Sequence, residues 1–198
     1  MNFAVVPACG HSSRMGRPKL ALPLGEHTVI EHVVATLRAG GVTTVLVVIG
    51  PHVPELAPLA RAAGAEVLAL AEPTPDLRAT VERGLAWLDE HYHPQAENCW
   101  LLAPGDHPQF SAEVVRQLLL TAPVVPQFIL VPTWQGQRGH PTLFRWHHIP
   151  GLRAHSIHEG INGYLRRHAE TILELPVSEP GICMNLDTPE DYQRIQPG

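Results

Sequence analysis

Short apolar runs alternate with amphipathic stretches along this chain, and the alternation indicates which elements form. Runs dominated by valine, leucine and isoleucine predict buried strands over 3–8, 42–49, 65–70, 99–103, 128–132, 142–144 and 173–177. Stretches with apolar side chains three or four positions apart predict helices over 29–39, 55–63, 76–91 and 147–168, and from 111 and 188 onward. Strands that alternate with helices are typical of a parallel sheet covered on both faces. We therefore expect one α/β domain, 1–198, with a doubly wound, mostly parallel sheet.

Residues at the predicted boundaries support this division. Thr28 and Ser111 stand where a helix N-cap is expected, since their hydroxyls can accept from free backbone N–H groups. A polar turn over 135–139 joins two of the later strands. Pro150 and Gly160 are expected to interrupt the helix predicted over 147–168.

The bulk composition narrows the classes of partner. Of 198 residues, 44% are hydrophobic and 17% are charged, which is ordinary for a globular domain. The formal net charge of −5 argues against nucleic acid or an acidic membrane as the main partner. We expect a cytoplasmic protein, because no leader precedes Phe3 and no apolar run approaches the length of a membrane span.

The most informative segment follows the first predicted strand. Gly10 and Gly16 bracket a short loop that contains Arg14, and Lys19 comes shortly after it. Glycine permits positive φ and a close approach of the backbone to a ligand, and such a turn can direct several N–H groups at one anion. Arginine can bind phosphate oxygens as a planar fork and lysine as a point charge. The loop is therefore predicted to bind a triphosphate, although its spacing matches neither G-x-x-x-x-G-K-[ST] nor G-x-G-x-x-G.

A second candidate group follows the fourth predicted strand, 99–103. Asp106 lies in a short turn that begins at Pro104 and ends at Pro108. Ligands of open α/β sheets sit beyond the carboxyl ends of the strands, which brings Asp106 toward the loop after the first strand. Mg²⁺ prefers carboxylate and phosphate oxygens, so Asp106 is placed to hold Mg²⁺ against a triphosphate. A purely turn-forming role for this aspartate is the alternative.

The first loop also resembles a known signature. It is similar to the A-A-G-x-S-x-R-M-G-x-x-K motif of the nucleotidyltransferase superfamily, and most of all to the molybdenum cofactor cytidylyltransferases. Cys9 stands in place of the second alanine, and the positions in register are Gly10, Ser12, Arg14, Met15, Gly16 and Lys19. The resemblance implies a Rossmann-like nucleotidyltransferase domain. It also implies nucleotide binding by Ala8, Cys9, Gly10, Ser12, Ser13, Arg14, Gly16 and Lys19.

Three further positions take a role from this resemblance. Segment 101–108 resembles the family's L-x-x-x-D-x-P, whose aspartate is a metal ligand, so Asp106 would bind the metal. Segment 185–192 resembles D-I-D-T-P-E-D-Y, which makes Asp187 either a second metal ligand or a simple cap for the last helix. Thr80 stands where the family has a serine near the nucleotide.

Two segments concern the acceptor substrate. Residues 138–144 resemble R-G-H-P-x-L-F, which faces the acceptor in the family. The family's G-D-x-G-A-R aligns with 157–162, where His158 and Asn162 replace the aspartate and the arginine. These replacements leave open a nucleotide-binding regulator or chaperone without transfer activity.

The implied activity is transfer of CMP from CTP, with Mg²⁺, to molybdopterin or a related phosphorylated small molecule, with release of pyrophosphate. Arg14, Lys19 and Asp106 would be the catalytic residues. CTP is favoured over GTP because relatives with alanine at the position of Cys9 resemble CTP users, whereas guanylyl relatives carry glycine there. A sugar- or polyol-phosphate acceptor is the alternative, and a molybdoenzyme is the protein partner that the resemblance suggests.

Overall fold

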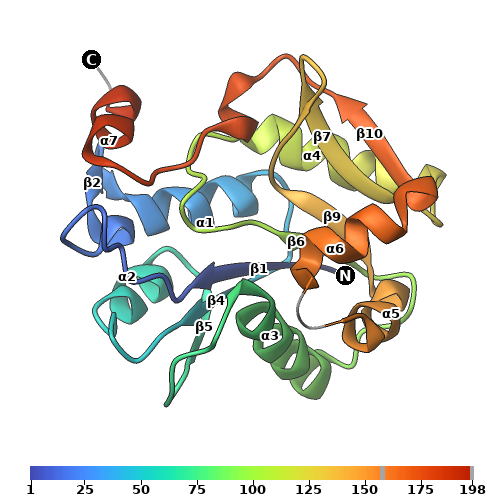
Figure 1. Cartoon of the computed structure of the whole chain (residues 1–198), viewed down its shortest axis with the longest axis horizontal. Helices are drawn as coiled ribbons and strands as arrows, with labels where there is room; N and C mark the ends of the chain where they lie inside the picture. Colours follow the sequence, from blue (N-terminus) through green and yellow to red (C-terminus); the bar gives the residue numbers. More distant parts are fainter. Residues whose placement is uncertain (157–158, 197–198) are drawn as a thin grey trace.

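The structure, a computed structural model, describes residues 1–156 and 159–196. Its centre is a sheet with the strand order β10-β7-β9-β6-β1-β4-β5, and β8 pairs with β7 (Figure 1). Neighbouring strands on this path run parallel except where β9 pairs with β6 and β7. The strands are β1 (Asn2–Ala8), β4 (Thr44–Ile49), β5 (Glu66–Ala69), β6 (Cys99–Leu102), β7 (Ile129–Trp134), β8 (Gln137–Arg138), β9 (Thr142–Arg145) and β10 (Ile172–Pro176). The predicted α/β class with a mostly parallel sheet is confirmed.

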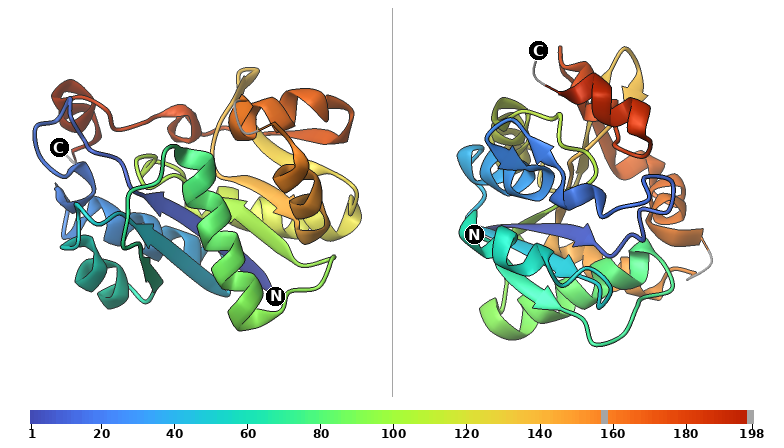
Figure 2. Two further views of the ribbon diagram at one scale, coloured as in Figure 1. Left: turned by 60° about the horizontal axis from the view of Figure 1, so that its bottom comes forward. Right: turned by 90° about the vertical axis from the view of Figure 1, so that its left-hand side faces the viewer.

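Helices cover both faces of this sheet, and Figure 2 shows α3 lying across one of them. The alternation along β1 explains the two layers, because successive side chains of a strand point to opposite faces. Ala4 and Val6 join a core with α1, α2 and α4, whereas Phe3 and Val5 join a second core with α3, α5 and α6. The helices are α1 (Val29–Ala39), α2 (Leu56–Ala62), α3 (Leu77–Tyr92), α4 (Ala112–Thr121), α5 (Ile149–Ala154), α6 (Gly160–Arg167) and α7 (Pro189–Ile195).

Helix α3 packs closely on the sheet because of one glycine. A Cβ added at Gly84 would lie 2.9 Å from Val48 Cγ2 and 3.0 Å from Val5 Cγ1, so a larger residue would push the helix away. At its start, the carboxylate of Asp76 accepts a hydrogen bond from the Ala79 amide, which caps the helix. The cap and the close packing fix the first turns of α3 beside the end of β1.

The structure departs from the predicted elements in three places. The helical region after β9 divides after Ala154 and not at Pro150, which lies in the first turn of α5, where proline loses no hydrogen bond. The turn over 135–139 contains the short strand β8, paired with β7. A hairpin of β2 (Pro23–Leu24) and β3 (His27–Thr28) also forms between the first loop and α1. Two-residue strands leave no apolar periodicity to read.

Arg78 of α3 holds the end of α5 in place. Its guanidinium, 4% exposed, donates to the carbonyls of Leu152 and Ser156, each at 2.7 Å, and to Glu82 Oε1 at 2.8 Å. A cation is favourable at a helix C-terminus, where carbonyl groups lack partners. In residues 1–156 and 159–196, no helix combines the length and the hydropathy of a membrane span.

His148, just before α5, should make the stability of the protein depend on pH. Its Nδ1 lies 3.2 Å from the Tyr164 hydroxyl of α6, and burial lowers the pKa of the imidazole from 6.5 to about 4. The neutral form is therefore favoured on folding, and stability is lost as pH falls from 6.5 toward 4. Between pH 7 and pH 4.5, the wild type should lose about 2 kcal/mol more than His148→Gln in urea unfolding. Parallel stability curves for the two proteins would contradict this.

Candidate active site

The two segments singled out in the sequence meet at one edge of the sheet. β1 and β6 are parallel neighbours, with Val5 opposite Leu102, so the loop after β1 and the turn with Asp106 leave the sheet side by side. A cavity of about 230 Å³ lies between them. Its lining residues are Pro7, Ala8, Gly10, His11, Ser12, Ser13, Arg14, Lys19, Leu20, Asp106 and Asp187.

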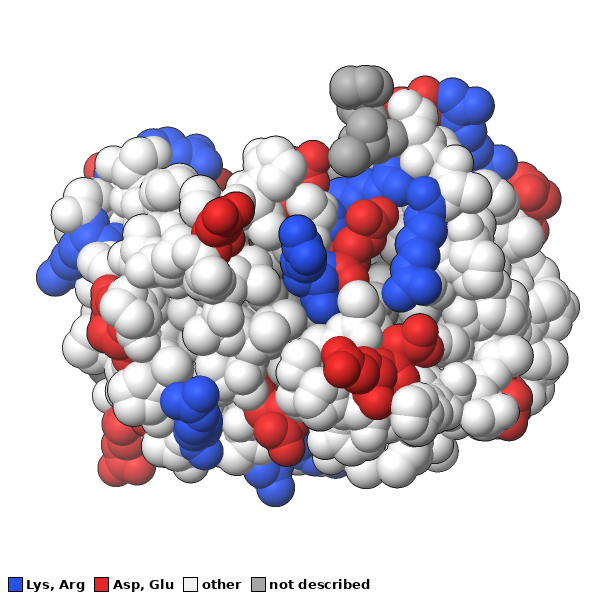
Figure 3. All heavy atoms as spheres, turned by 90° about the horizontal axis from the view of Figure 1, so that it is seen from below, with Lys and Arg blue, Asp and Glu red and all other residues white. Residues whose placement is uncertain are grey.

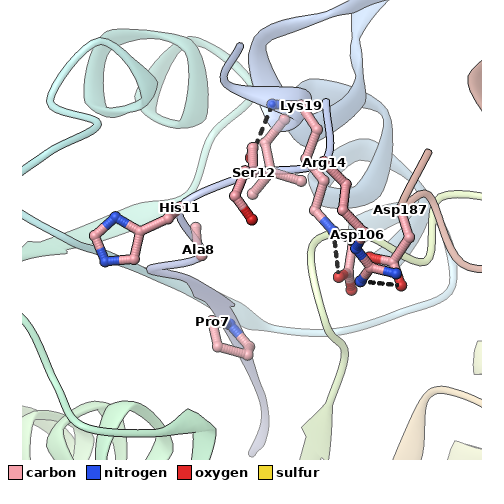
Figure 4. A pocket seen from close by; sticks show the side chains of 11 residues that line it. Pro7, Ala8, His11, Ser12, Arg14, Lys19, Asp106 and Asp187 are labelled. Carbon is pink, nitrogen blue, oxygen red and sulfur yellow. Dashed lines mark hydrogen bonds and ion pairs between the residues drawn. The ribbon is translucent and has the colours of Figure 1, made fainter. Parts of the chain in front are cut away.

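Four charged side chains in the lining of this cavity contact one another. Lys19 Nζ lies 2.8 Å from Asp106 Oδ2 and 2.9 Å from Asp187 Oδ1. Arg14 Nη2 lies 3.0 Å from the other oxygen of Asp187. Figure 4 shows both cationic side chains directed at the two carboxylates, and the His11 ring on the other side of the strand end. The structure thus brings Asp106 and Asp187, which are distant in the chain, to Arg14 and Lys19 of the first loop.

Burial and pairing set the charge of this cluster. Burial alone would lower the pKa of Lys19, but the carboxylates of Asp106 and Asp187 outweigh it and raise that pKa. The hydrogen bond from Lys19, with smaller contributions from the Lys19 and Arg14 charges, lowers the pKa of Asp187 despite burial. Lys19 and Asp187 are therefore both held in their charged forms at neutral pH. On the face of the molecule shown in Figure 3, Lys and Arg side chains are interspersed with Asp and Glu.

Only some of the backbone amides in the loop between β1 and Lys19 are available to bind an anion. The amides of Met15 and Gly16 donate to the Ser12 carbonyl at 2.9 and 3.1 Å, and the Lys19 amide donates to Ser12 Oγ at 3.2 Å. In the described part of the chain, no protein acceptor pairs with the amides of residues 10–14. Of the seven amides from 10 to 16, five are therefore available to a ligand.

The two loop glycines have different tasks. A Cβ added at Gly10 would meet no atom within 4 Å, so this glycine keeps the cavity side of the loop open. Gly16 has φ of +65° and lies outside the lining of the cavity, so it shapes the turn and does not face a ligand there. The sequence expectation of nucleotide contact therefore finds no support at Gly16.

A second cavity, of about 490 Å³, adjoins the first and shares Pro7, Gly10, His11 and Asp106 with it. Cys9 and Thr80, both predicted to contact the nucleotide, line this second cavity. The Thr80 hydroxyl lies 2.5 Å from that of Thr74 and 3.1 Å from the Asp76 carbonyl. The size and the polar lining of this cavity suit a nucleoside beside the phosphate-sized first cavity.

Two contacts between histidines at this site were not predicted, although His140 itself lies in the segment 138–144 that resembles the acceptor motif. The rings of His11 and His52 stack with centroids 4.0 Å apart. His107 and His140 meet edge to face at 4.7 Å, and burial lowers the pKa of both, to about 4 for His140. His52 follows the carboxyl end of β4, next to β1, so the strand order was the signal that could have found it. His158, in the predicted acceptor segment, lies outside the described residues.

A doubly wound sheet with a glycine-bearing, cationic loop after its first strand is typical of nucleotide-binding α/β enzymes. Within that class, the family model described as "MobA-like NTP transferase domain" matches residues 4–172. The chain belongs to this family and is a nucleotidyltransferase, as the sequence resemblance predicted.

Solved structures of similar proteins have the same fold. Rv0371c from Mycobacterium tuberculosis H37Rv is 26% identical with a TM-score of 0.76, over 98% of this chain and 96% of that chain. The same protein in complex with manganese gives 24% identity and a TM-score of 0.78 over the same shares. A 4-diphosphocytidyl-2C-methyl-D-erythritol synthase is 19% identical with a TM-score of 0.72, over 98% of this chain and 96% of that chain. No curated protein has a sequence that matches this chain.

Proposed function

We propose that this nucleotidyltransferase moves the CMP unit of CTP onto a phosphorylated small molecule of the molybdopterin class. The observation that carries the proposal is the cluster of Arg14, Lys19, Asp106 and Asp187 at the joint edge of β1 and β6. Asp106 and Asp187 already bind the Lys19 ammonium, and Arg14 and the loop N–H groups lie beside them. This arrangement suits a triphosphate together with a bound metal ion. CTP is the favoured nucleotide because Cys9, close in size to the alanine of the cytidylyl relatives, lines the nucleoside-sized cavity.

The triphosphate would lie along the loop after β1. The free amides of residues 10–14 would bind the β- and γ-phosphates together with Arg14. Lys19 would exchange one carboxylate contact for a phosphate oxygen, since its ammonium has three donors and a flexible stem. Each of these groups neutralises charge that grows on the departing pyrophosphate.

Asp106 and Asp187 fit a divalent cation. Asp106 Oδ2 and Asp187 Oδ1 approach the same Lys19 Nζ at 2.8 and 2.9 Å, so the two oxygens face one point, which is what a hard cation needs. When bound, Mg²⁺ would supply charge neutralisation at the α-phosphate. The manganese complex of Rv0371c supports the use of a divalent cation in proteins of this fold.

In the transfer step, the role of the protein is to position the reacting groups. An oxygen of the acceptor phosphate attacks the α-phosphorus in line, and the bond from that phosphorus to the bridging oxygen of the β-phosphate breaks. Pyrophosphate leaves with the electron pair of that bond, and the acceptor phosphate is already ionised, so no proton has to be removed. Orientation of the two phosphates and neutralisation of their charge then account for most of the rate. A product of the molybdopterin class would pass on to a molybdoenzyme.

The test separates nucleotide binding from transfer. Isothermal titration with CTP, GTP, ATP and UTP plus Mg²⁺ should show the tightest binding for CTP, and pyrophosphate should be released only when a phosphorylated acceptor is added. Tighter binding of GTP than CTP would contradict the assignment of the base. Binding without pyrophosphate release for molybdopterin, sugar phosphates and polyol phosphates alike would favour the nucleotide-binding regulator.

A further inference from the structure

A groove leads away from the nucleoside-sized cavity toward α6. The cavity of about 490 Å³ adjoins a cavity of about 360 Å³, which shares Asp76, Leu77 and His140 with it. A third cavity, also about 360 Å³, follows and again includes His140 in its lining. His140 lines all three, so the cavities adjoin one another in a row from Asp106 to Arg138 and Arg166.

The character of the lining changes along this path. The middle is mixed in character: the apolar Leu102 and Ile161 and the polar Asn162 are shared by the second and third cavities. The far end holds two guanidinium groups, Arg138 of β8 and Arg166 of α6. Two cations at one end of the groove contrast with the formal net charge of −5 of the whole chain. Guanidinium groups bind carboxylate and phosphate by paired hydrogen bonds, so this end suits an anion.

The two arginines differ in how far they are already engaged. Arg138 Nε donates to Glu174 Oε1 of β10 at 2.8 Å, which fixes the side chain and leaves its two Nη groups for a ligand. In residues 1–156 and 159–196, no carboxylate pairs with Arg166. Glu174 therefore competes with any anion for Arg138 but not for Arg166.

His140 sits at the middle of the groove as an uncharged hydrogen-bonding group. Its Nδ1 is buried and has no partner in the described part of the chain. A neutral imidazole nitrogen pairs with a hydroxyl without adding charge, and an unpaired buried polar atom gains from such a partner. The groove thus offers a hydroxyl-binding centre followed by an anion-binding end.

We propose that this groove binds an acceptor with two acidic ends, and that Arg138 and Arg166 hold the end that does not react. The reacting phosphate lies toward Asp106, a hydroxyl of the acceptor meets His140, and a second acidic group, such as a carboxylate, lies between the arginines. This deepens the proposed function, on which it rests for the position of the reacting phosphate. An acceptor of this kind carries a second acidic group besides its reacting phosphate, unlike a neutral polyol phosphate.

A matched pair of probes tests the anion-binding end directly. Phosphogluconate and sorbitol phosphate have the same carbon chain and phosphate, and they differ by a carboxylate in place of a hydroxymethyl group. Isothermal titration of the nucleotide-free protein should show phosphogluconate binding about fivefold more tightly, as one exposed charged contact provides. Arg166→Gln should remove this preference. Arg153→Gln, an equal change of charge on α5 outside the groove lining, should leave it intact.

Glu174→Gln should change the affinity for phosphogluconate in the opposite direction to Arg166→Gln. A gain in affinity cannot come from damage to the fold. The substitution releases Arg138 from its ion pair, so phosphogluconate should bind more tightly than to the wild type, while sorbitol phosphate changes little. Equal affinity of the two probes for the wild type, or no binding of either at millimolar concentration, would overturn the proposal. An equal loss for both probes in Arg166→Gln would place the phosphate at the arginines and overturn the assigned direction. Because no nucleotide is present, failure here is separate from failure of CTP binding.

Discussion

Lys19→Ala should lower kcat for pyrophosphate release on the order of 100-fold, and Arg14→Ala should have a similar effect. Each removes a cation that neutralises the leaving pyrophosphate, and the loss of one such preorganised contact costs about 3 kcal/mol of transition-state stabilisation. Lys19→Arg should recover part of the rate, since a charge returns with a different shape. The measurement is steady-state release of pyrophosphate at saturating CTP and acceptor, with circular dichroism to verify the fold.

A neighbouring cation provides the control for this prediction. Arg17 lies in the same loop, but its guanidinium sits over the Tyr192 ring, 5.9 Å from the centroid, and it does not line the cavity. Arg17→Ala makes the same change of net charge and should leave kcat within about twofold, because a single exposed charge is screened by solvent. If Arg17→Ala and Lys19→Ala lose the same activity, the effect is one of overall charge and the assigned role of Lys19 is wrong.

Asp106→Asn should reduce kcat about 100- to 1000-fold and weaken the binding of Mn²⁺ to the CTP complex. The change keeps the shape of the side chain and removes the charge that a divalent cation requires. It also leaves Lys19 with Asp187 as its partner, so the free energy of unfolding should fall by only about 1 kcal/mol. Electron paramagnetic resonance of Mn²⁺ measures the metal affinity without reference to turnover.

Asp89→Asn, the same substitution at an exposed position of α3, is the control, and it should change neither kcat nor Mn²⁺ binding. An Asp106→Asn protein that binds Mn²⁺ and CTP as the wild type does would show that this carboxylate serves only to pair with Lys19. The alternative role of Asp187 as a helix cap is wrong, because the Thr188 hydroxyl caps α7 by accepting from the Asp191 amide. The same pair of assays on Asp187→Asn would test its role as a metal ligand.

The long elements and the first loop were predictable because each depends on local information. The apolar runs of β1, β4 and β6 are buried on both faces, and Thr28 and Ser111 cap α1 and α4 as expected. The loop after β1 could be recognised because glycine and fixed cations occur together at one strand end. Helix caps and buried strands depend on residues that are neighbours in the sequence, so they could be predicted without knowledge of the tertiary fold.

The contacts that complete the site depend on the order of the strands, which the sequence does not state. Nothing local indicates that His52 stacks on His11, or that His107 meets His140. The direct contact of Lys19 with both carboxylates was also missed, since it joins a helix turn to two distant loops. The use of the Met15 and Gly16 amides inside the loop needs the backbone angles that only the structure supplies.

The ion pair between Lys19 and Asp187 spans 168 positions of the chain. During synthesis on a ribosome, the first strand and its loop emerge long before their acidic counterpart has been made. A chain that ends before Asp187 therefore leaves Arg14 without its carboxylate and Lys19 with Asp106 alone, so the charges of this loop are fully paired only when synthesis is nearly complete.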